Sequence, residues 1–235
     1  MLVSDQMTHY HSLARWFSGG LGLFVAKEVC KELQSIPNLP SGQTLLQLGS
    51  GGENAWLDKL SFKNKWIASP TLLRNSHSVQ CSLEELPFTR NSLDCLVVPL
   101  TLELYPNHYD LLDEIDRVLK PMGHVIFICL NPWSPWGLAL RCGLLDLYAK
   151  AHAHLHTPSH LHRTFLQRGY RQCFLGHFCY IPPINKASVL EKLVFLDEMG
   201  KMLWPFPSGL YCYIAQKYEY AEPDELAFCD SVPAR

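Results

Sequence analysis

Short apolar runs and segments with apolar residues at helical spacing follow one another along most of the chain. Four runs have the length and composition of strands that are buried on both faces: residues 44–48, 65–68, 93–98 and 125–130. Residues 9–35 predict a helix that is interrupted around 19–22, and residues 53–60 predict a short helix. This alternation of strand and helix is typical of an α/β fold with a parallel sheet.

The strongest helical pattern starts at Asn107, which is suited to cap it, and runs to residue 119. Two acid–base pairs at i, i+4 spacing are expected to support this helix, Asp113 with Arg117 and Asp116 with Lys120. Later in the chain, residues 172–181 and 209–217 predict strands that enclose a helix near 186–203, whereas residues 69–83 give no clear pattern.

Composition narrows the class of protein. Charged residues make up 18% of the chain and the net charge is −2, so strong nonspecific binding to nucleic acid is disfavoured. No apolar run approaches the roughly 20 residues that span a bilayer, and residues 19–26 are too short for a secretory signal. We therefore expect a cytoplasmic protein, without a membrane span and without an obligate protein partner. The nine cysteines contain no Cys-x-x-Cys spacing, which predicts reduced thiols.

The most informative stretch is the apolar run 45–48 with Gly49, Gly51 and Gly52 directly after it. Glycines that follow a buried strand let the chain turn sharply and approach a ligand closely. In open α/β sheets, ligands bind beyond the carboxyl ends of the strands. Taken alone, this stretch is consistent with a ligand-binding turn and equally with an ordinary tight turn.

Three further motifs follow in order: Glu-Glu-Leu-Pro-Phe at 84–88, Leu-Glu-Leu at 102–104 and Arg-Val-Leu-Lys-Pro at 117–121. With the glycine turn, they make residues 43–130 resemble the class I S-adenosylmethionine-dependent methyltransferases of the type 11 domain family, in a smaller bacterial branch. The resemblance implies a Rossmann-like, seven-stranded sheet that is mostly parallel with its last strand antiparallel, and helices on both faces.

The resemblance further implies a single methyltransferase domain over residues 1–235. Its parts would be an N-terminal helical segment, a cofactor-binding half, a substrate-side half and a tail, at residues 1–42, 43–130, 131–220 and 221–235. The implied cofactor is S-adenosylmethionine, and the implied methyl acceptor is a small or medium-sized molecule. Methyl transfer is an in-line displacement that mainly requires alignment of the reactants, so we assign no catalytic residue.

Carried over position by position, the resemblance places the cofactor at Gln47, Gly49, Ser50, Gly51, Ser69, Ser82, Leu83 and Pro99. Gln47 and Ser82 stand where the family has acids. No Asp or Glu lies between Asp58 and Glu84, where an acid would hold the ribose hydroxyls. Each lost charge-assisted hydrogen bond removes about 1.5–3 kcal/mol, so we expect the cofactor to bind weakly.

These departures leave a second hypothesis open, a noncatalytic protein that keeps the methyltransferase fold as a binding or interaction module. A nicotinamide dinucleotide oxidoreductase is disfavoured. Its Gly-x-Gly-x-x-Gly fingerprint would end at Asn54, and no acid follows at the spacing of about 20 residues that the ribose requires.

Histidines crowd into one segment, at His152, His154, His156, His160 and His162. No thiolate or carboxylate joins them and Pro158 interrupts the helical spacing, so we expect solvated or substrate-facing histidines and no metal. Two aromatic pairs have two possible roles each. Trp133 and Trp136 either line a substrate pocket or pack in the core, and Trp16 and Phe17 either cover the cofactor or pack in the core.

Overall fold

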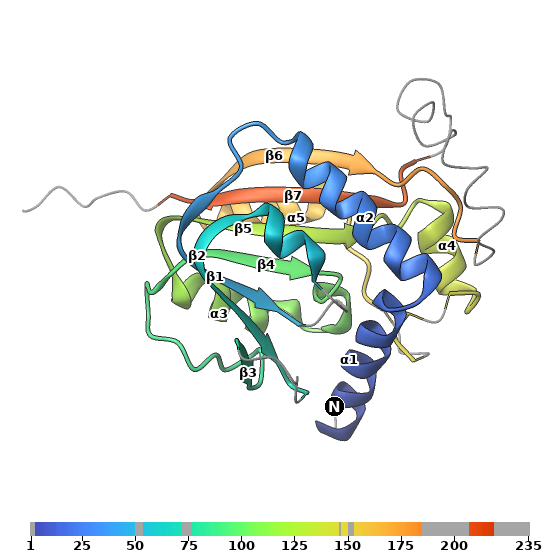
Figure 1. Ribbon diagram of the computed structural model, residues 1–235, viewed down its shortest axis with the longest axis horizontal. Helices are drawn as coiled ribbons and strands as arrows, with labels where there is room; N and C mark the ends of the chain where they lie inside the picture. Colours follow the sequence, from blue (N-terminus) through green and yellow to red (C-terminus); the bar gives the residue numbers. More distant parts are fainter. Residues whose placement is uncertain are drawn as a thin grey trace, which may run out of the picture.

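The computed structural model describes residues 3–49, 54–71, 77–145, 147–149, 153–184 and 207–218. Its centre is a seven-stranded sheet in the order β3-β2-β1-β4-β5-β7-β6 (Figure 1). The strands are β1 Ser41–Leu48, β2 Ser61–Ser69, β3 Ser78–Gln80, β4 Leu93–Pro99, β5 Leu119–Leu130, β6 Tyr170–Phe178 and β7 Leu210–Lys217. β1 to β5 pair in parallel, and β7 runs antiparallel to both β5 and β6.

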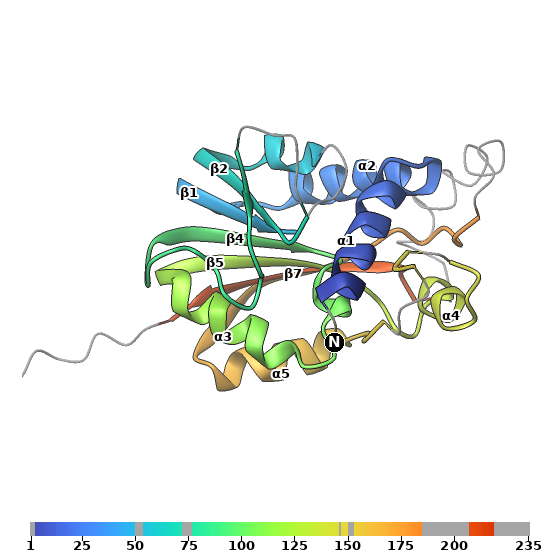
Figure 2. The same ribbon diagram turned by 90° about the horizontal axis from the view of Figure 1, so that it is seen from below.

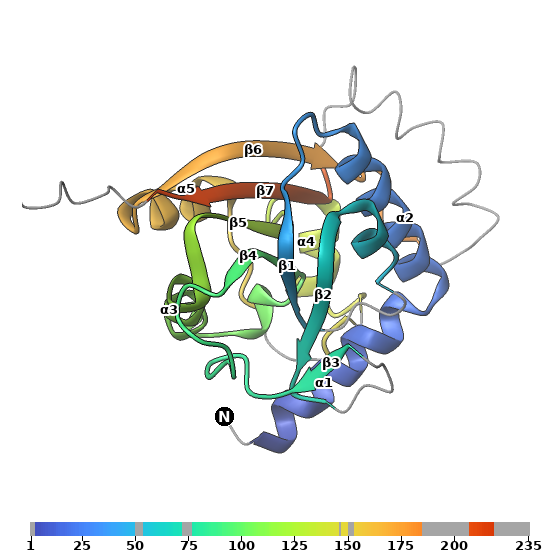
Figure 3. The ribbon, with the colours of Figure 1, turned by 60° about the vertical axis from the view of Figure 1, so that its left-hand side comes forward.

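Helices cover both faces of this sheet. They are α1 Val3–Phe17, α2 Gly20–Ser35, η1 Ala55–Lys59, η2 Leu102–Leu104, α3 His108–Val118, α4 Pro135–Arg141 and α5 Pro158–Gln167, where η marks a 3-10 helix. α2 and η1 lie over one face, and α3 and α5 lie over the other (Figure 2). β3 and β6 form the two edges, and the sheet twists strongly between them (Figure 3).

The predicted α/β fold, its seven strands and its antiparallel last strand are confirmed. The four apolar runs are the cores of β1, β2, β4 and β5, whose inward residues are buried. The short helix expected over residues 53–60 is a 3-10 helix at residues 55–59, and the short strand β3 lies in the segment that gave no pattern. The helix expected near 186–203 lies outside the described residues.

The helix α3 forms as predicted, but its charged residues have other partners. Asn107 makes no capping hydrogen bond to the backbone, and its side-chain amide donates to Asp110 instead. Both expected i, i+4 pairs are wrong, because these residues bind groups outside the pair. Arg117 pairs with Glu114 three residues earlier, and Lys120 pairs with Asp94 of β4.

The motif residue Arg117 fastens α3 to the preceding loop. Its guanidinium donates to the carbonyl oxygens of Leu86 and Phe88, each at 2.8 Å. Glu114 completes the arrangement by accepting from the backbone N–H of Leu86 at 2.8 Å. Two motifs that are about 30 residues apart in the sequence are thus one hydrogen-bonded unit, since a planar guanidinium donates in several fixed directions.

Composition led us to expect reduced thiols and no membrane-spanning segment. Free thiols are found at Cys30, Cys81, Cys95, Cys129, Cys142, Cys173 and Cys212. Cys229 lies outside the described residues. Among the helices that are described, none is long and apolar enough to cross a bilayer.

Candidate active site

The glycine turn lies at the carboxyl edge of the sheet. β1 lies between β2 and β4, so its last residues stand beside Ser69 at the end of β2 and Pro99 at the end of β4. The N–H of Gly49 donates to the carbonyl oxygen of Ala68 at 2.7 Å, which extends the β1–β2 pairing into the turn. This is the edge at which open parallel sheets bind ligands.

Gly49 occupies a backbone conformation and a space that exclude other residues. Its φ is +81°, in the left-handed region, and an added Cβ would come within 2.6 Å of Thr101 Oγ1. The Thr101 hydroxyl is itself fixed, because it lies 2.9 Å from the carbonyl oxygen of Leu48 and 3.0 Å from that of Pro99. The turn after β1 is therefore held against the end of β4.

The side chain of Gln47 is hydrogen-bonded to this turn. It is fully buried, and its amide nitrogen donates to the carbonyl oxygen of Gly49 at 2.8 Å and to the side-chain oxygen of Asn54. Its oxygen accepts from the indole N–H of Trp56 at 2.8 Å. Both ends of the amide are used by the protein, so Gln47 connects Gly49 to Asn54 and Trp56. The expected cofactor residues Ser50 and Gly51 lie outside the described residues.

The other expected cofactor residues lie along the same edge with different exposure. Ser69 is fully buried, and its hydroxyl lies 2.9 Å from that of Thr71. Ser82 is exposed and accepts from the N–H of Glu84 at 3.3 Å, whereas Leu83 is buried. Two hydroxyls therefore stand at the end of β2, where the family has a ribose-binding acid.

Sequence reasoning missed the contribution of α1, which crosses this edge in Figures 1 and 2. The phenol of Tyr10 donates to that of Tyr105 at 2.7 Å, and its ring lies 3.5 Å from the Cβ position of Gly49. Burial raises the pKa of Tyr10 well above its usual value, and the neighbouring Tyr105 and Glu84 add to this effect. α1 thus covers the turn with a neutral, buried tyrosine pair.

One member of each aromatic pair packs in the core. Trp136 is buried, and its indole N–H donates to the carbonyl oxygen of Ile181 at 2.6 Å, so it packs in the core. Trp133 is 74% exposed. Phe17 is buried against Trp56, with ring centroids 5.3 Å apart, so it too is a core residue.

Glu103 is an acid with no exposed surface. One carboxyl oxygen accepts from the N–H of Leu130 at 2.9 Å, and the other has no hydrogen-bond partner among the described residues. Burial raises the pKa of this carboxyl to about 7, although the hydrogen bonds from Leu130 and Cys129 act in the opposite direction. Glu103 lies in η2, four residues after the end of β4.

The histidine segment separates into different environments. His152 lies outside the described residues, His154 is exposed, and His162 Nδ1 lies 3.4 Å from the hydroxyl of Tyr213. His156 and His160 turn toward His108 at the start of α3, which the sequence pattern did not connect to them. Burial, with the neighbouring histidines, lowers the pKa of His156 to about 4.

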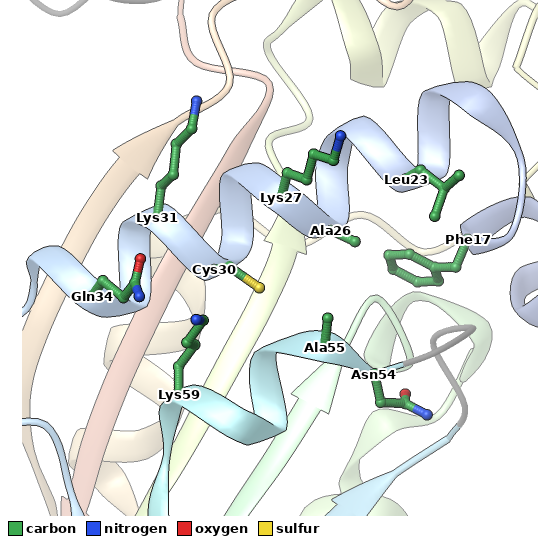
Figure 4. A pocket seen from close by; sticks show the side chains of 10 residues that line it. All are labelled: Phe17, Leu23, Ala26, Lys27, Cys30, Lys31, Gln34, Asn54, Ala55 and Lys59. Carbon is green, nitrogen blue, oxygen red and sulfur yellow. The ribbon is translucent and has the colours of Figure 1, made fainter.

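A groove of about 380 Å³ opens between α2 and η1 (Figure 4). Its floor is apolar, and Lys27, Lys31 and Lys59 stand along it. Its lining residue Asn54 accepts from the side-chain amide of Gln47, which also donates to Gly49, so one end of the groove adjoins the glycine turn.

Strand order, the antiparallel β7 and the glycine turn at the end of β1 together define the class I S-adenosylmethionine-dependent methyltransferase fold. A methyltransferase from Thermotoga maritima, described as a possible histamine N-methyltransferase, shares this fold with a TM-score of 0.65 at 14% identity, over 92% of this chain and 100% of that one. A geranyl diphosphate C-methyltransferase from Streptomyces coelicolor, solved with S-adenosyl-L-homocysteine, has a TM-score of 0.55 at 13% identity, over 83% and 76%.

Residues 48–127 match the family model described as a methyltransferase domain, which confirms the resemblance seen in the motifs. A ubiquinone/menaquinone biosynthesis C-methyltransferase from Nitrosospira multiformis is 36% identical over 95 residues. That match covers 39% of this chain and 38% of the relative. The part of the chain that matches the family model includes Gly49 and Arg117.

Proposed function

We propose that the protein transfers a methyl group from S-adenosylmethionine to a small or medium-sized substrate. The observation that carries this proposal is the turn at Gly49, which is kept in a conformation and a space that only glycine fits. Gln47 and Thr101 bind the backbone on both sides of it. The turn lies at the carboxyl end of β1, the edge at which open parallel sheets bind ligands.

The residues present fit one end of the cofactor better than the other. The glycine turn at the end of β1 would receive the amino-acid end. At the end of β2, Ser69 and Thr71 offer hydroxyls instead of a carboxylate, so the ribose would be held by weaker, neutral hydrogen bonds. Ser82 is exposed and free to face the adenine side. This agrees with weak cofactor binding.

The cofactor supplies a methyl group that is already activated on a sulfonium. The chain's part is to fix the edge of the sheet and to exclude water from it. α1 does the second by placing Tyr10, which donates to Tyr105, against the turn. Orientation of the two reactants is itself a large contribution to rate, so no general base is assigned.

The alternative is a noncatalytic protein of the same fold. It is favoured by the internal use of Gln47, whose polar groups all bind protein atoms, and by the hydroxyl pair at the end of β2. The two hypotheses differ in whether the purified protein binds S-adenosylmethionine and S-adenosylhomocysteine at all.

The experiment is titration calorimetry of both ligands with wild type, Gly49→Ala and Gly143→Ala. Gly143 is the matched control, because its φ is +69° while an added Cβ would meet nothing within 4 Å. We expect weak binding by wild type and Gly143→Ala, and at least about 10-fold weaker binding by folded Gly49→Ala. No heat with wild type at millimolar ligand would establish the noncatalytic alternative. Equal binding by Gly49→Ala would show that the site lies elsewhere.

A further inference from the structure

Three histidines from two distant parts of the chain meet beside the carboxyl edge of β4. His108 is the first residue of α3, His156 precedes α5, and His160 lies in the first turn of α5. Their candidate ligand nitrogens all lie within 4.8 Å of one another. The ring centroids of His108 and His156 are 4.6 Å apart, and each lies 5.7 Å from that of His160.

Two of these rings carry a buried nitrogen that the protein leaves unused. His108 and His156 are each 9% exposed, and neither Nε2 atom has a hydrogen-bond partner in the described part of the chain. A buried polar atom without a partner costs free energy, so two of them in contact need a reason. His160 is exposed and gives this pair an opening to solvent.

Hydrogen bonds to the backbone hold the segment that carries His156 and His160. The hydroxyl of Tyr211 donates to the carbonyl oxygen of His156 at 2.8 Å. The N–H of His160 donates to Thr157, the N-cap of α5, at 3.2 Å. The N–H of His154 donates to the carbonyl oxygen of Glu103 at 2.8 Å, which holds the segment against the end of β4. The three rings are therefore brought together by the fold.

We propose that His108, His156 and His160 bind a divalent transition metal ion of the zinc type. Three imidazoles without carboxylates suit zinc, nickel or copper, and do not suit magnesium or calcium, which take oxygen ligands. Ligand nitrogens around tetrahedral zinc stand about 3.4 Å apart, so the rings need to close by little more than 1 Å. The exposed side chain of His160 allows this movement.

One cationic side chain acts on this group of histidines. Arg168 is the guanidinium that faces His108, and it is paired with Asp113 at 2.7 Å and with Asp116. These two carboxylates partly offset the positive charge of the guanidinium. Three protein ligands leave the fourth position of the metal for water or for a group of another molecule, on the side where His160 is exposed.

This inference departs from the expectation of no metal, because that expectation considered only residues 152–162. It does not rest on methyl transfer, and its test uses no S-adenosylmethionine. Untagged protein, stripped with chelator and dialysed, is titrated with zinc chloride alone by calorimetry. We expect one zinc per chain, a thermal midpoint raised by zinc and not by magnesium chloride, and a cobalt-loaded spectrum without thiolate charge transfer.

The variants separate a built site from chance binding by surface histidines or cysteines. His108→Ala and His160→Ala should each lower zinc affinity by more than about 100-fold, whereas His154→Ala and His162→Ala should leave it unchanged. His160 is exposed, so its variant is informative even if His108→Ala fails to fold. Absence of zinc binding by wild type, or equal losses in all four variants, would overturn the proposal.

Discussion

Glu103 makes the stability of this protein depend on pH in a direction opposite to that of most carboxylates. Its carboxyl is fully buried, and burial raises its pKa from 4.5 to about 7. The folded state therefore holds this proton more tightly than the unfolded state does. The resulting stability is fully present below about pH 4.5 and is lost as the pH rises through about 7.

The magnitude follows from the same shift. Each pKa unit corresponds to about 1.4 kcal/mol, so ionisation of Glu103 in the folded state costs on the order of 3 kcal/mol. Glu103→Gln removes the charge and keeps an oxygen that accepts from the N–H of Leu130. We expect its free energy of unfolding, minus that of wild type, to rise by about 2–3 kcal/mol between pH 5 and pH 8.

The assay is urea unfolding of both proteins across this range, since the difference between them cancels the other titrating groups. Glu114→Gln is the control, and its difference from wild type should stay nearly constant from pH 5 to pH 8. Arg117 and the N–H of Leu86 lower the pKa of Glu114, so the stability it contributes is present above pH 4.5 and is lost below it. A difference in unfolding free energy between Glu103→Gln and wild type that stays constant from pH 5 to pH 8 would refute the reasoning.

Three further outcomes are expected. Gln47→Glu should lower the free energy of unfolding, measured in urea, by about 2–3 kcal/mol, because a carboxylate would face the acceptor oxygens of Gly49 and Asn54. A change below about 0.5 kcal/mol would contradict the assigned hydrogen bonds. Arg117→Lys should lower the free energy of unfolding by about 1 kcal/mol, since the side chain is partly exposed but loses its hydrogen bonds to two carbonyl oxygens. An unchanged urea midpoint would contradict this expectation. Thiol counting in denaturant without reductant should return nearly nine, and a reproducible shortfall of two would show a disulfide.

Much of the fold could be predicted from the sequence because its strands are buried on both faces. Such strands are continuous apolar runs, and β1, β4 and β5 were found from this signal alone. β3 has only three residues and is not fully buried, so it carries no comparable pattern. The charge pairs of α3 were wrong because spacing along a helix says nothing about neighbours such as Asp94 and Arg168, which approach from other elements.

The site was harder to predict than the fold for the same reason. Gly49 was found because a glycine turn is a local feature of the sequence. Tyr10 and His108 were missed, since each meets its partners only after distant segments pack together. Aromatic residues and single histidines are common in helices, so neither carried a signal of its own. Their roles depend on tertiary contacts that no local spacing encodes.

The motifs that identify the family act mainly on the scaffold. Arg117 binds the loop at 86–88, Asp94 accepts from the N–H groups of Gln43 and Thr44 and from Lys120, and Gln47 binds the turn. None of these contacts needs a cofactor in order to stabilise the fold. Substitutions at Arg117 or Asp94 should therefore act on unfolding free energy. Gly49 is also required by the fold, because its φ is +81° and a Cβ would meet Thr101, so its variants have to be compared in ligand binding and not in stability alone. Ligand binding by Gly49→Ala and Gly143→Ala consequently separates the two hypotheses more sharply than any variant of the family motifs.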